Sequence, residues 1–197
     1  MLRIALSFLL LVCSPLVLAE VKLLASIKPL QLIAAAVQDG LGSPEVLLPP
    51  GASAHNFALR PSDVRRVQDA RLLYWIGPDM ETFLPRVLQG RNMPSVAVQE
   101  LPGLQLRYFA APAQAGQAAE AASEAHDHDH RPGSLDAHLW LSTVNARRIA
   151  AKMAADLAAL DPANAPRYQE NLRAFETRLD ALDVRLRNLY GVGERNV

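Results

Sequence analysis

The chain is almost without cysteine, and its charges leave no excess of either sign. Cys13 is the only cysteine among the 197 residues, and 20 basic residues balance 20 acidic ones. A chain that loses Cys13 with its leader can form neither a disulfide nor a thiolate metal site, so any metal must have nitrogen and oxygen ligands. The balanced charge offers no basic field for nucleic acid, which is therefore not an expected partner.

The first nineteen residues, "MLRIALSFLLLVCSPLVLA", predict a secretory signal peptide cleaved after Ala19. They contain one basic residue, Arg3, followed by an apolar run and a small residue at the end. The alternative is a short membrane anchor, but Ser14 and Pro15 interrupt a run that is already short for a membrane span. Val12, which is not a small residue, precedes Cys13 and argues against a lipid-anchored form.

Short apolar strands alternate with short helices from residue 20 to about residue 101. This alternation predicts an α/β fold, with a parallel sheet and helices on its faces. Turn residues, proline positions and β-type runs give the boundaries. We expect strands at 21–27, 44–51, 71–77 and 94–101, and helices at 29–38, 60–70 and 80–90.

The second half of the chain contains a low-complexity insertion and two longer helices. Residues 110–134 are rich in Ala, Gln, Gly, Glu, His and Asp, and this composition predicts a disordered insertion. A helix capped by Ser142 or Thr143 should run to about Leu160. Residues 161–190 then carry an apolar stripe at helical spacing: Tyr168, Leu172, Phe175, Leu179, Leu182, Leu186 and Leu189. A coiled-coil dimer arm is possible, but we expect the helix to pack along its own domain.

Two isolated histidines occupy similar places in the predicted fold. His55 lies in a loop between a strand and a helix, and His138 also lies just before a helix. Such loops gather at the carboxyl ends of parallel strands, where open α/β sheets bind ligands. The two imidazoles could therefore converge on one ion, for which zinc is well suited, if they approach within about 6 Å. Alternatively, each histidine forms only a hydrogen bond to a neighbour.

Three further histidines, His126, His128 and His130, alternate with aspartates inside the insertion. A flexible segment does not preorganise its ligands, so we expect weak, rapidly exchanging metal binding by this tract. An inert, solvated loop is the alternative.

The chain resembles the ZnuA-like periplasmic zinc-binding receptors of ABC importers, a cluster that also contains manganese receptors and adhesins. The resemblance is carried by "PPGASAHNFALRPSDVRRVQDARLLYWIGPDMETFL", the His-Asp tract, "DAHLWLSTVNARRIA" and the long helix ending near Tyr190. It implies that His55 and His138 each supply one metal ligand, that the histidine tract favours zinc over manganese, and that the long helix is a spine joining two similar α/β lobes.

Two departures from the family pattern stand out. Ala54 and Asn56 flank the first histidine, where many zinc receptors have acidic residues. Only "GVGERNV" follows Tyr190, whereas the family has a second lobe with a third histidine and an acidic ligand. We therefore expect a fragment or an interrupted reading frame with four parts: a signal peptide (1–19), a metal-binding lobe (20–160), a linking helix (161–190) and a tail (191–197).

The function expected from these features is periplasmic capture of zinc for a membrane permease, impaired by the missing lobe. A manganese receptor and a passive metal buffer or adhesion module are the alternatives. A zinc hydrolase is not expected, because the sequence has no HExxH-like or paired-carboxylate motif.

Overall fold

A four-stranded parallel sheet forms the centre of the molecule. The computed structural model describes residues 20–109 and 133–191. The strands are β1 (Leu23–Ala25), β2 (Glu45–Val46), β3 (Leu72–Trp75) and β4 (Ser95–Ala97), in the order β2-β1-β3-β4. Every neighbouring pair is parallel, with Leu24 opposite both Glu45 and Leu73. The predicted α/β fold with a parallel sheet is confirmed.

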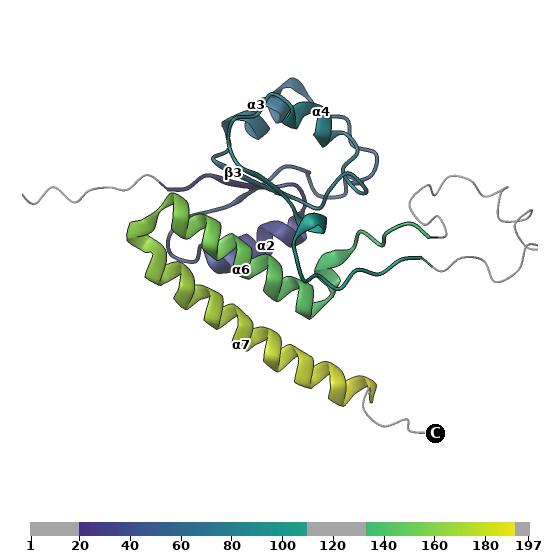
Figure 1. Ribbon diagram of the computed structural model, residues 1–197, viewed down its shortest axis with the longest axis vertical. Helices are drawn as coiled ribbons and strands as arrows, with labels where there is room; N and C mark the ends of the chain where they lie inside the picture. The colour runs from purple at the N-terminus through teal and green to yellow at the C-terminus, as the bar shows by residue number, and fades with distance from the viewer. Residues whose placement is uncertain (1–19, 110–132, 192–197) are drawn as a thin grey trace, which may run out of the picture.

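Helices cover both faces of this sheet (Figure 1). On one face lie α3 (Pro61–Asp69) and the short α4 (Leu84–Leu88), and on the other lie α2 (Lys28–Val37) and α6 (Thr143–Leu160). The long α7 (Ala165–Tyr190) packs against α2 and α6, outside them relative to the sheet. The described residues also form the short 3₁₀ turns η1 (Val98–Glu100), η4 (Leu139–Leu141) and η5 (Pro162–Asn164).

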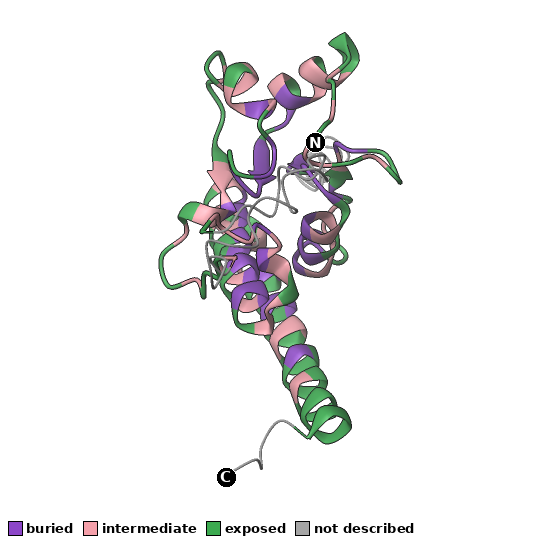
Figure 2. Cartoon of the chain, turned by 90° about the vertical axis from the view of Figure 1, so that its right-hand side faces the viewer, coloured by how far each residue is buried: buried purple, intermediate pink, exposed green. Residues whose placement is uncertain are grey.

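The core lies between the sheet and its helices. The residues of β1 and β3 are buried throughout, which explains why their sequences are continuous apolar runs rather than alternating ones. Leu30 of α2 and Ile149, Met153 and Leu157 of α6 have no exposed surface and pack in the same core. Figure 2 shows this buried centre, with exposure increasing toward the far end of α7.

The helix expected at 80–90 is shorter than predicted. Residues 78–80 and 82–83 form turns, and α4 begins only at Leu84. The cause is a turn that closes on Gly77: the backbone N–H groups of Met80 and Glu81 donate to its carbonyl oxygen, at 3.1 and 2.9 Å. The chain therefore leaves β3 through a tight turn before it becomes helical.

The apolar stripe of α7 is covered over only part of its length. Tyr168, Leu172 and Leu179 are buried, whereas the exposed fractions of Leu182, Leu186 and Leu189 are 40%, 38% and 71%. The helix thus packs along its own domain through Leu179, and the exposure of the stripe rises beyond that residue. The helix runs past the end of the layer formed by α2 and α6 (Figure 1), and α6 still reaches it at Asp183, which pairs with Arg147 at 2.9 Å.

A short antiparallel pairing joins the two segments on either side of residues 110–132. Phe109 N–H donates to Ser134 O at 3.0 Å, and Asp136 N–H donates to Arg107 O at 2.8 Å. Gly133 and Ser134 are thus ordered by pairing, although the insertion was predicted to extend through Ser134. Within the described ranges, no helix has the length and apolar character needed to cross a membrane.

Candidate metal site

His55 lies in the loop between β2 and α3. Pro49 and Pro50 end the extended segment that follows β2. Gly51 then turns the chain with a φ of +80°. The backbone N–H of His55 donates to Ser53 Oγ at 3.3 Å. This loop, residues 49–60, is called the His55 loop below.

The His55 loop is held to the fold through apolar side chains. Phe57 packs edge-on against Phe83, with ring centroids 5.7 Å apart. Ala54, Phe57 and Leu59 are partly buried against the core. The loop ends where Arg60 N–H donates to Asp63 Oδ2 at 3.0 Å, an acceptor in the first turn of α3.

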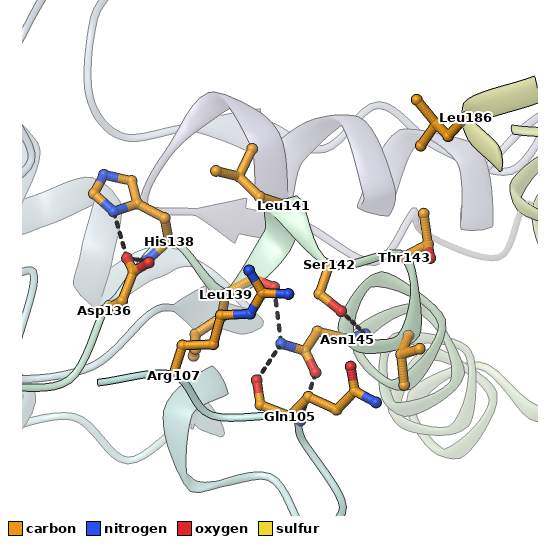
Figure 3. A pocket seen from close by; sticks show the side chains of 11 residues that line it. Gln105, Arg107, Asp136, His138, Leu139, Leu141, Ser142, Thr143, Asn145 and Leu186 are labelled. Carbon is orange, nitrogen blue, oxygen red and sulfur yellow. Dashed lines mark hydrogen bonds and ion pairs between the residues drawn. The ribbon is translucent and has the colours of Figure 1, made fainter. Parts of the chain in front are cut away.

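His138 stands immediately before η4 and is fixed by its neighbours in sequence. Asp136 Oδ1 lies 2.8 Å from His138 Nδ1 and also accepts from the His138 backbone N–H at 3.1 Å (Figure 3). A metal-ligating histidine commonly donates its other ring N–H to a carboxylate, and in this arrangement Nε2 would be the nitrogen available to a metal ion. The Trp140 ring meets the His138 ring edge-on, with centroids 5.3 Å apart.

Buried Asn145 secures the backbone beneath His138. Its amide group donates to Leu139 O and Gln105 O, both at 3.0 Å, and its Oδ1 accepts from Gln105 N–H at 2.8 Å (Figure 3). Ser142 caps α6 as predicted, with its Oγ accepting from Asn145 N–H at 3.4 Å. One side chain therefore ties η4 to the segment that follows η1.

The structure brings the two predicted histidines to one cleft. Their ring centroids are 6.3 Å apart, and the planes are tilted by 56°. Two imidazoles on one tetrahedral zinc, with bonds of about 2.0–2.1 Å, have centroids roughly 5 Å apart. The observed separation is just above the limit of about 6 Å expected from the sequence, and a side-chain movement of about 1 Å would close the difference. The cleft has a volume of about 600 Å³ and is also lined by Met80 and Trp140.

The pair is not part of a larger ligand cluster within residues 20–109 and 133–191. There, no group of three or more His, Cys, Asp or Glu side chains is arranged to hold a metal. Ala54 and Asn56 beside His55 supply no carboxylate. His126, His128 and His130 lie outside the described residues, and so does the predicted signal peptide.

Two supports of the site were not singled out from the sequence. Asp136 had a signal, because an acidic residue two positions before a histidine in a loop can reach its ring nitrogen. Buried Asn145 had none, because its role depends on contact with Gln105, 40 residues away.

Comparison with known proteins finds relatives that align with most of this chain. The high-affinity zinc uptake system protein ZnuA of Yersinia pestis is 38% identical over 178 residues, which is 86% of this chain and 56% of that protein. The metal-dependent lipoprotein YcdH of Bacillus subtilis has the same fold, with a TM-score of 0.66 at 20% identity over 86% of this chain and 55% of that one. The Zn(II)-bound ZnuA-like domain of Streptococcus pneumoniae AdcA gives 0.63 at 20% identity over 84% and 54%.

The chain therefore has the fold of the matched parts of YcdH and of the ZnuA-like domain of AdcA. The family itself follows from the sequence: the family described as zinc-uptake complex component A, periplasmic, matches residues 23–194, and the chain belongs to it. This family consists of receptors rather than enzymes. The chain spans little more than half the length of the curated relatives that it matches.

Proposed function

We propose that this chain captures zinc in the periplasm for delivery to the membrane permease of an ABC importer. The observation that carries the proposal is the placement of His55 and His138 on one cleft, with ring centroids 6.3 Å apart. Residues 20–160 form the metal-binding lobe and residues 161–190 the linking helix. The protein acts as a carrier and catalyses no reaction.

The ligand chemistry supports zinc over manganese. Both proposed ligands are histidines, whose ring nitrogens suit zinc, whereas manganese prefers more oxygen ligands. The named function of the Yersinia relative, zinc uptake, points the same way. His126, His128 and His130 add weak binding in the same compartment.

Two nitrogen ligands do not complete the four-fold coordination of a structural zinc site. The remaining positions would be taken by water or by groups outside the described residues. The proposal therefore requires that ligands other than His55 and His138 complete the zinc site.

Zinc affinity tests the proposal directly. Chelator competition should give one site that is lost in both His55→Ala and His138→Ala, and excess manganese should not displace the zinc. Growth under zinc starvation, with and without the permease, separates a transport receptor from a passive buffer or adhesion module. Unchanged zinc affinity in both alanine variants would contradict the assigned site.

A further inference from the structure

The carboxyl end of the sheet is filled by a side chain that the proposed site does not use. The order β2-β1-β3-β4 places the reversal of strand order between β1 and β3. In open α/β sheets ligands bind outside the strand ends at this point. Here Glu81, which has no exposed surface, reaches the residues that follow both strands.

Three donors converge on the Glu81 carboxylate. Ser26 Oγ, just after β1, donates to Oε1 at 2.5 Å. After β3, Ile76 N–H donates to Oε1 at 3.2 Å and Gly77 N–H donates to Oε2 at 3.0 Å. Burial raises the pKa of this carboxyl, and the hydrogen bonds from Ser26 and from the nearby backbone N–H groups act in the opposite direction. The backbone donors are buried and need an acceptor, which Glu81 supplies.

The turn that carries Glu81 is compact and depends on Gly77. The Gly77 carbonyl accepts from Glu81 N–H, and Glu81 O accepts from Leu84 N–H at 3.0 Å, at the start of α4. Gly77 has a φ of +146°, and a Cβ built on it would overlap the side chain of Gln99. This segment, residues 77–84, is called the Glu81 turn.

The Glu81 turn also contacts the metal cleft. Met80, which is buried, lines the same cleft as His55 and His138. Phe83 is the partner of Phe57, which lies two residues after His55. A short path therefore connects the Glu81 carboxylate, through the two phenylalanines, to the His55 loop.

We propose that Glu81, together with Ser26, is a positioning residue for the metal site. Its hydrogen bonds lock the Glu81 turn to the ends of β1 and β3, and the locked turn holds the His55 loop in place through Phe83 and Met80. The inference rests on the proposed function, because it assumes that His55 binds the zinc ion. Glu81 itself does not bind the ion.

The test measures zinc affinity of the full chain by chelator competition in Glu81→Gln and Ser26→Ala. The Glu81→Gln substitution replaces one acceptor oxygen with an amide donor that faces a backbone N–H. Loss of an orienting partner of a metal ligand costs roughly 10–100-fold in affinity, and we expect about tenfold here because the effect is indirect. The His55 imidazole resonances of the zinc-free variants should broaden or split, since the loop then samples several positions.

Asn171→Ala is the matched control. Asn171 is a buried polar residue whose amide donates to Val37 O and Asp39 O, both at 2.9 Å, at the end of α2 far from the strand carboxyl ends. Its loss should lower the unfolding midpoint but change zinc affinity by less than about twofold, because distant sites act independently. The His55 resonances should stay single and sharp.

A folded Glu81→Gln protein with wild-type zinc affinity and sharp His55 resonances would overturn the proposal. If Glu81→Gln does not fold, Ser26→Ala decides by the same two readouts, because it removes one donor and leaves the carboxylate in place. His55→Ala, measured alongside, distinguishes failure of the proposed zinc site from failure of the positioning role of Glu81. If His55→Ala binds zinc normally, His55 is not a ligand. If only His55→Ala loses zinc, the site stands and the positioning role of Glu81 fails.

Discussion

The two histidines of the cleft are held in opposite ways. His138 is fixed by residues beside it in the sequence: Asp136 binds its ring and Trp140 packs against it. His55 is held by a loop whose Phe57 contacts Phe83, which comes from another loop. The direct partners of the His138 ring are therefore local, with Asn145 adding one long-range tie to Gln105, whereas the His55 loop depends on the assembled sheet. Loss of a ring partner such as Asp136 should therefore disturb His138 with little effect on the fold, whereas loss of a packing partner of the His55 loop should disturb both His55 and the fold.

The largest effect should come from removing either ligand. Changes in groups that only orient a ligand cost roughly 10–100-fold in metal affinity, so His55→Ala and His138→Ala should each cost at least about 100-fold. Chelator competition measures the affinity, and circular dichroism checks that both variants remain folded. If one alanine variant kept tight binding, the histidine that it lacks would not be a zinc ligand, and only the support of the other histidine would matter for binding.

Asp136→Asn and Phe57→Ala distinguish the two kinds of support. Asp136→Asn should weaken zinc binding roughly tenfold, because the amide no longer holds the Nδ1 proton as a carboxylate does. Because Asp136 is partly exposed, the free energy of unfolding of the Asp136→Asn protein should differ from that of wild type by less than about 0.5 kcal/mol.

Phe57→Ala should weaken zinc binding and also lower the free energy of unfolding by about 1–2 kcal/mol, because it removes an aromatic pair from the core surface. Denaturant titrations beside the zinc measurements provide the check. Equal stability losses in Phe57→Ala and Asp136→Asn would remove the proposed difference between local and remote support.

A smaller effect concerns pH. The pKa of Glu81 is raised above its ordinary value of 4.5, chiefly by burial, so the folded state holds the proton more tightly than the unfolded state. This contribution to stability is complete below pH 4.5 and is lost as the pH rises through the raised pKa, at about 1.4 kcal/mol for each pH unit between the two pKa values. Wild type should therefore lose stability relative to Glu81→Gln over that range.

Urea unfolding of both proteins from about pH 4 upward measures this difference. Asn171→Ala serves as the control, because it retains Glu81 and should follow the wild-type pH dependence. A constant difference between wild type and Glu81→Gln would show that the carboxyl does not titrate differently on folding.

The smallest effect on the tight site should follow deletion of residues 120–131. The deletion removes His126, His128 and His130 but none of the described supports of the cleft. Affinity at the tightest site should change by less than about twofold, while the number of bound zinc ions falls. Titration calorimetry reports both values. Loss of the tightest site would make the tract a primary ligand.

The order of strands and helices could be predicted because each element has a local signal. Pro61 and Asp63 mark the start of α3, and the Ser142 cap marks the start of α6. The late start of α4 could not be predicted, because residues 80–90 have a helical pattern that the turn at Gly77 overrides. The half-covered stripe of α7 was also out of reach, since spacing identifies an apolar face but not the length of its partner.

Some features of the candidate site could likewise be predicted from the sequence, and others could not. The positions of His55 and His138 in loops before helices were enough to predict that they lie on one cleft, although their ring centroids, 6.3 Å apart, remain just beyond the expected limit. No signal in the sequence indicated that Glu81 is buried, because a glutamate before Thr82 and Phe83 resembles any solvent-exposed residue in a helix. Its partner Ser26 is 55 residues away, and only the assembled sheet joins them.

The uneven cover of α7 means that its two halves should exchange amide hydrogens at different rates. The first half is held by Tyr168, which donates to Asp161 at 3.0 Å, and by Asn171, so its amides become accessible only when the lobe opens. Beyond Asp183, which binds Arg147 at 2.9 Å, the side chains are mostly exposed. The last turns can therefore unfold locally while the sheet stays intact. Only the part of α7 up to its ion pair with α6 is expected to remain rigid.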